Sequence, residues 1–144
     1  MCLVNSFAFT EVNANGSVSI TALSFAGTGA ITSAGDNGVS VVATGGNITT
    51  GATLTANTSA IAPVLLKATA NILVNNALQS SGGAVTLWAD SDETAQGGIL
   101  MAAGSSIVSN GGDVTLGGGN GATAADGYAK ATASITESTG GVYS

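Results

Sequence analysis

The sequence predicts an all-β chain that winds into a right-handed parallel β-solenoid of about five coils. Two observations lead to this prediction: a glycine pair recurs at equal intervals, and the segments between the glycines alternate apolar and polar side chains. Alternation with a period of two is typical of β-strands, because successive side chains point to opposite faces. A stack of coils explains both observations, since each coil repeats the strands and corners of the one before it.

The repeat is clearest in two phrases, "SSGGAVTLWADSD" at residues 80–92 and "SNGGDVTLGGGNG" at residues 109–121. Their glycine pairs are Gly82-Gly83 and Gly111-Gly112. A third pair, Gly140-Gly141, follows the second at the same interval and leads into Val142 and Tyr143. We expect a new coil to begin at this third pair. The glycines suit the corners of a coil, where some residues need a positive φ that is unfavourable for other residue types.

Side-chain alternation places the strands between these corners. Val85 and Leu87 point to one face, while Thr86 and Trp88 point to the other. No segment combines a 3.6-residue apolar period with helix caps. A β-sandwich is the alternative fold, but it does not predict a repeat that covers loops as well as strands. The asparagines expected to stack into polar ladders at the corners are Asn75, Asn76 and Asn110.

Composition limits the functions that the chain can have. Only 7% of the 144 residues are charged, His is absent, and the formal net charge is −6. Lys67 and Lys130 are the only basic side chains, so we expect no nucleic-acid partner, which would need several cations opposite its phosphates. No run approaches the roughly 20 apolar residues of a membrane span. We expect no enzymatic activity, because acid–base catalysis would depend on carboxylates alone.

The phrase "DSDET" at residues 90–94 is the one acidic cluster. Asp90, Asp92 and Glu93 offer oxygen ligands on a turn, which is the chemistry that calcium prefers. The alternative is a solvated acidic turn that keeps the solenoid soluble, with no cofactor at all. Trp88 is predicted to face outward beside this turn. It is a candidate contact for a sugar ring or a protein partner, unless it folds over its own loop.

The segment "GGAVTLWADSDETAQGGILMAAGSSIVSNGGDVTLGGG" resembles the repeats of filamentous-haemagglutinin-type adhesins and related β-strand-repeat surface proteins of bacteria. The match is best over residues 71–119 and fainter from residue 16 to the C-terminus. The resemblance implies a secreted, elongated right-handed β-helix at the cell surface, with a role in adhesion, aggregation or biofilm attachment.

The two ends of the chain are the candidate assembly surfaces, because a solenoid leaves unpaired strand edges there. We expect an apolar N-terminal segment at 1–15, which docks on another subunit, and solenoid repeats at 16–144. The assembly residues are Leu3, Val4, Phe7, Phe9, Val142 and Tyr143. The single cysteine, Cys2, is either a thiol without a role or a cross-link between chains.

These observations predict the structural subunit of an extracellular surface fibre. Its partners would be copies of itself, joined end to end or by strand exchange. The alternative from another class is an adhesin segment, a binding module whose outer face recognises a glycan or a host protein.

Overall fold

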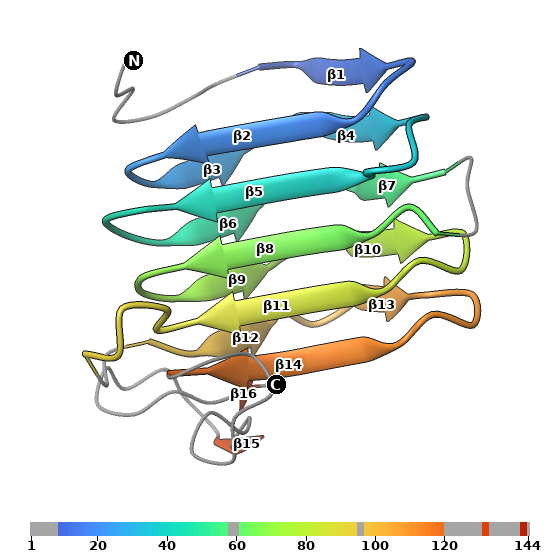
Figure 1. Ribbon diagram of the computed structural model, residues 1–144. Helices are drawn as coiled ribbons and strands as arrows, with labels where there is room; N and C mark the ends of the chain where they lie inside the picture. Colours follow the sequence, from blue (N-terminus) through green and yellow to red (C-terminus); the bar gives the residue numbers. More distant parts are fainter. Residues whose placement is uncertain (1–8, 58–60, 95–96, 120–130, 133–141, 144) are drawn as a thin grey trace.

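The computed structural model describes residues 9–57, 61–94, 97–119, 131–132 and 142–143. Within these ranges every regular element is a β-strand, and all the strand pairings are parallel. The strands form three sheets (Figure 1). Sheet 1 contains β1 (Glu11–Ala14), β4 (Ala30–Ser33), β7 (Leu54–Ala56), β10 (Ala77–Ser80) and β13 (Ser106–Val108). Sheet 2 contains β2 (Val18–Ala22), β5 (Val39–Ala43), β8 (Val64–Ala68), β11 (Val85–Ala89) and β14 (Val114–Gly118). Sheet 3 contains β3 (Phe25–Gly27), β6 (Ile48–Thr50), β9 (Ile72–Val74), β12 (Ile99–Met101), β16 (Val142–Tyr143) and β15 (Ala131–Thr132).

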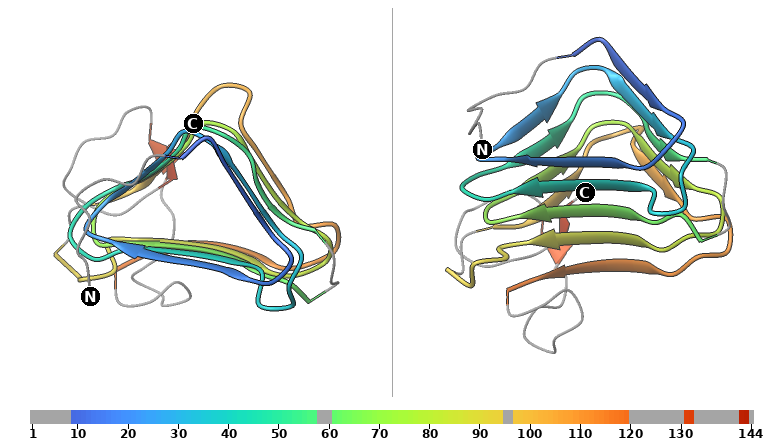
Figure 2. Two further views of the ribbon diagram at one scale, coloured as in Figure 1. Left: turned by 90° about the horizontal axis from the view of Figure 1, so that it is seen from above. Right: turned by 45° about the horizontal axis from the view of Figure 1, so that its top comes forward.

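The chain visits the sheets in a fixed order. After β1, each coil gives one strand to sheet 2, the next to sheet 3 and the third to sheet 1. The three sheets are the sides of a triangular prism (Figure 2). Seen from the N-terminal end, the chain turns clockwise as it recedes, so the solenoid is right-handed (Figures 1 and 2). Right-handed crossovers between parallel strands are the general rule, and the predicted fold class is confirmed.

The expected number of about five coils is slightly too high. The described strands contain four sets of three, namely β2–β4, β5–β7, β8–β10 and β11–β13. Three full turns separate β2 from β11, and β14 begins the path of the next coil. The predicted repeats run from residue 16 to residue 144, but beyond β14 the described part of the chain adds only β15 and β16, both in sheet 3.

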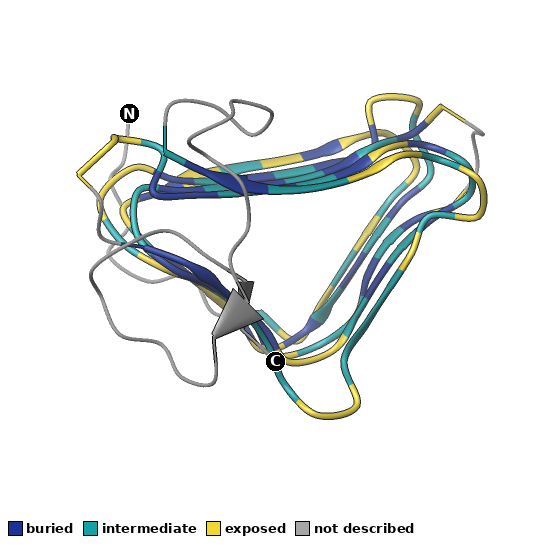
Figure 3. Ribbon diagram, turned by 90° about the horizontal axis from the view of Figure 1, so that it is seen from below, coloured by how far each residue is buried: buried dark blue, intermediate teal, exposed yellow. Residues whose placement is uncertain are grey.

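The core consists of columns of similar apolar side chains, one residue per coil. The first inward position of sheet 2 is valine in all five strands, in register from Val18 to Val114. The equivalent columns are Phe25, Ile48, Ile72 and Ile99 in sheet 3, and Val12, Ile31, Leu54, Leu78 and Ile107 in sheet 1. The inner members are fully buried, and exposed residues gather at the corners of the triangle (Figure 3). Alternation places these side chains on one face because the side-chain period of a strand is two.

One corner contains an asparagine ladder. The Asn71 side chain donates from Nδ2 to Asn47 Oδ1 at 3.3 Å, and its own Oδ1 accepts from the Gly98 backbone N–H at 2.9 Å. This ladder was not the expected one. Asn76 and Asn110 donate to backbone carbonyls of the preceding coil instead, and for Asn75 only its backbone N–H contacts the coil before it. The contact between asparagine side chains is therefore made by Asn47 and Asn71, while Asn76 and Asn110 tie their corners through backbone carbonyls.

Gly38 shows why a corner requires glycine. Its φ is +61°, and a Cβ there would lie 1.9 Å from the Pro63 carbonyl oxygen of the next coil. The positive φ and the close approach of Pro63 each disfavour any residue other than glycine. Together they make glycine necessary where the chain enters β5.

The structure also describes parts of both ends. At the N-terminal end, Glu11–Ala14 lies within the expected docking segment and pairs with β4, so strand pairing begins before residue 16. At the C-terminal end, Val142 pairs with Ile99 and Tyr143 with Leu100, in sheet 3. The glycine repeat aligns these two residues with sheet 2 instead. The difference follows from the path of the chain, because sheet 3 is the next sheet after β14.

Candidate functional site

Trp88 lies on the outer face of sheet 2, as alternation predicts, and is half-buried. Register places it between Lys67 of β8 and Gly117 of β14. Its indole Nε1 donates to the Gly119 carbonyl at 3.0 Å, and Lys67 Nζ lies 4.0 Å from the centre of the ring. A cation over an aromatic face is attracted by the ring quadrupole. Both contacts hold the indole against its own chain.

Gly117 explains why the two repeated phrases differ at this position. A side chain on Gly117 would stand outward beside Trp88, since the two residues are in register on neighbouring strands. Glycine leaves that space open, and the indole reaches past it to the carbonyl of Gly119. Gly117 itself is buried despite its outward position. An aromatic side chain on one strand here covers the bare backbone of the next.

This arrangement limits what Trp88 offers to a ligand. Stacking on a sugar requires an open ring face, and Lys67 lies over one of the two faces. The indole N–H already has an acceptor within the chain. The role of Trp88 as a partner contact therefore stays a prediction, and the described contacts give it a structural role first.

The acidic turn follows directly after β11. Asp90 has a φ of +50° and is only 3% exposed, while Asp92 and Glu93 are exposed. The Thr94 hydroxyl lies 3.3 Å from Asp90 Oδ1 and 3.1 Å from Asp92 Oδ1. Its single proton is donated to one of the two oxygens at a time. The turn is fixed to the coil before it by backbone bonds from Asp90 to Ala70 and from Ser91 to Ala68.

A calcium ion would need several of these oxygens to converge at about 2.4 Å from one point. Among the residues that the structure describes, no group of three or more His, Cys, Asp or Glu side chains is arranged to hold a metal ion. The Thr94 hydroxyl instead occupies the space between two of the predicted ligands. The calcium site at Asp90, Asp92 and Glu93 stays a prediction, and the geometry of the turn does not support it.

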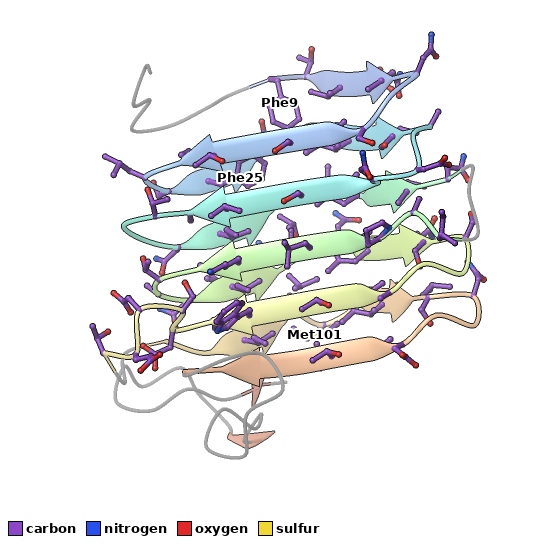
Figure 4. All side chains as sticks on the ribbon, in the orientation of Figure 1. Phe9, Phe25 and Met101 are labelled. Carbon is purple, nitrogen blue, oxygen red and sulfur yellow. The ribbon has the colours of Figure 1, made fainter. Side chains whose placement is uncertain are left out.

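The predicted assembly residues are described in part. Phe9 packs on the N-terminal end of the core, with its ring centroid 6.1 Å from that of Phe25 (Figure 4). At the opposite end Met101 is half-buried (Figure 4), and Val114 of β14 is 47% exposed. Val142 and Tyr143 form β16. The residues that lie outside the described ranges are Leu3, Val4, Phe7 and Cys2.

Sequence reasoning missed two pairs of contacting residues, Lys67 with Trp88 and Asn47 with Asn71. Both pairs join neighbouring coils, so finding them requires the length of each coil. The interval between Lys67 and Trp88 differs from that between Asn47 and Asn71, and both are shorter than the interval between the glycine pairs. No sequence signal other than a coil-by-coil alignment would have found them.

No protein-family model matches the chain, and no curated protein or solved structure matches it either. The resemblance to filamentous-haemagglutinin-type adhesins therefore has no support from these comparisons. In the described part of the chain, no helix has the length and apolar character needed to cross a membrane.

Proposed function

We propose that the chain is a structural subunit of an extracellular surface fibre, and that copies assemble end to end through the open edges of the solenoid. The observation that supports this most is the valine column of sheet 2. Its inner members are fully buried, but its last member, Val114, is 47% exposed at the C-terminal end. A column of this kind gains burial when another rung is added, because exposed apolar surface leaves water.

The outer face of the solenoid supports a structural role as well. Trp88, the largest outward side chain, is engaged by Lys67 and Gly119 within the chain. The acidic turn forms its own hydrogen bonds. These contacts favour a scaffold over a catalyst.

Negative-stain electron microscopy of the purified chain at neutral pH tests the proposal. Regular filaments are expected, and they should disappear in Val114→Asp, which places a charge on the inward position of the end rung. Val108→Asp is the matched control, because Val108 is also exposed, at 37%, but occupies the outward position of β13. Dispersed particles of the unaltered chain would contradict the proposal, and so would filaments that survive Val114→Asp.

An adhesin segment is the second candidate function. The observation that favours it is the partial exposure of Trp88 next to an exposed acidic turn. A glycan array probed with the unaltered chain and with Trp88→Ala tests this candidate. Binding that is lost in Trp88→Ala, while the circular dichroism spectrum is unchanged, would favour the adhesin.

A further inference from the structure

The two open edges of sheet 2 belong to β2 and β14. Within the described residues, β2 pairs with β5 and β14 pairs with β11, so each strand has one edge without a partner. All the strands of the sheet run in the same direction. One copy placed on the end of another in the same orientation would therefore continue a parallel sheet.

We infer that β14 of one copy pairs in parallel with β2 of the next, with Val114 beside Val18 of the neighbouring copy. This inference rests on the proposed function and specifies the contact. On its paired edge, β14 lies beside Val85, Thr86 and Leu87 of β11. The strand β2 offers Val18, Ser19 and Ile20, which have the same order of apolar and hydroxyl side chains.

The inward positions match along the whole strand in this register. Val114 lies beside Val18, Leu116 beside Ile20, and Gly118 beside Ala22 of the next copy. These are the same types of pair that the buried coils contain, where Val18, Ile20 and Ala22 face Val39, Val41 and Ala43. A slip of one residue would turn every inward side chain outward.

A backbone pattern supports the same register. The first N–H of each strand in sheet 2 donates to the carbonyl that precedes the strand of the next coil. The four bonds run from Val18 to Gly38, Val39 to Pro63, Val64 to Ala84 and Val85 to Asp113, at 2.8–2.9 Å. The equivalent donor at the C-terminal end is the Val114 N–H. The equivalent acceptor at the N-terminal end is the Ser17 carbonyl, so the fifth bond of the series would join the two copies.

The charges at the ends permit this contact. Asp113 would lie opposite Ser17, and Glu11 would lie opposite Ser106 when β1 of the next copy follows β13 in sheet 1. No two charged residues of the described strands and corners face each other in this register. The contact has two requirements in sheet 3. Phe9 of the next copy, which packs over Phe25, would share a level with β16 and must move aside, and β15 occupies the level that β3 of the next copy would take. The strand β15 must therefore leave its place beside β16 during assembly.

Disulfide cross-linking measures the register directly. The variant Ser19→Cys/Thr115→Cys is made with Cys2→Ser, incubated under filament-forming conditions and oxidised with oxidised glutathione. Both positions face outward on sheet 2. They would lie about 5 Å apart across the contact, within the range that a disulfide spans. Within one copy they lie at opposite ends of the sheet, so they cannot form a bond with each other.

The matched control is Thr21→Cys/Thr115→Cys, also with Cys2→Ser. Thr21 lies on the same outward face as Ser19, but it would be displaced to about 8 Å from Thr115, too far for a disulfide. We expect a ladder of cross-linked species on a non-reducing gel from the 19/115 variant, at about ten times the yield of the 21/115 variant. Circular dichroism spectra of both variants show that they fold.

The outcomes separate the register from the proposed function. Filaments with equal cross-linking in both variants would overturn the register, and so would dimers from Ser19→Cys alone, which indicate contact between two N-terminal ends. In both cases assembly itself would stand. An absence of filaments and of cross-links in every variant would overturn the proposed function together with the register.

Discussion

The description of the core as columns can be tested by truncating two leucines of one column, one in the middle of the solenoid and one at its end. Leu87 is fully buried in sheet 2, with Leu66 on one side and Leu116 on the other. Leu87→Ala replaces a fully buried isobutyl side chain with a methyl group and leaves a cavity between two leucines of the column, so we expect a loss of about 3 kcal/mol in the free energy of unfolding. Leu116→Ala makes the same chemical change at the half-buried end of the column, where about 1 kcal/mol is expected.

Urea unfolding, followed by circular dichroism and by the emission of the single tryptophan, measures the two losses. The two probes should give one transition, because a partial transition in a repeat protein would invalidate the comparison. Thr86→Ala is the control, since its outward side chain should contribute less than about 0.5 kcal/mol. Equal losses for Leu87→Ala and Leu116→Ala would refute the reasoning. A loss below about 1 kcal/mol for Leu87→Ala would do the same.

Three further substitutions test the corners and the outer face. Gly38→Ala should lower stability by about 3 kcal/mol or more, because it combines positive φ with a backbone clash, whereas Gly16→Ala, where a Cβ meets nothing within 4 Å, should change the thermal midpoint little. Trp88→Ala should reduce the free energy of unfolding in urea by about 1–2 kcal/mol. Asn71→Ala should lower the free energy of unfolding by about 1–3 kcal/mol and accelerate amide exchange at Gly98, whose N–H donates to the Asn71 side chain. Asn75→Ala should leave the stability and the exchange rate of Gly98 unchanged.

The sequence predicts the solenoid because its last coils are regular. Val85 and Val114 are separated by the same interval as the glycine pairs and are direct partners in the sheet, as the repeat implies. The earlier valines of the same column follow one another at shorter and unequal intervals; they are Val18, Val39 and Val64. The strands keep their length while the corners vary, so a fixed spacing cannot align these coils. The number of coils and the partner of each residue therefore could not be predicted from the glycine repeat.

The direction of Trp88 could be predicted, but its contacts could not. Alternation determines the face to which a side chain points, and it placed Trp88 outward correctly. The partners Lys67 and Gly119 lie on neighbouring coils, and only the register between coils brings them near the indole. The same limit applies to Val142. The glycine pair before it aligns it with sheet 2, but in the structure it pairs with Ile99 in sheet 3.

The inner and outer columns of sheet 2 differ in a way that bears on function. At the first inward position the side chain is valine in every strand, whereas the outward position of Trp88 contains threonine, valine, lysine, tryptophan and glycine in succession. A ligand with its own regular spacing, such as a fibrous polysaccharide, would be matched by repeated outward side chains. In the strands of this sheet the repeated chemistry points inward, and among its valines only Val114, in the end rung β14, is exposed. The surface that best complements an end rung is another rung with the same order of side chains, which the opposite end of a second copy supplies.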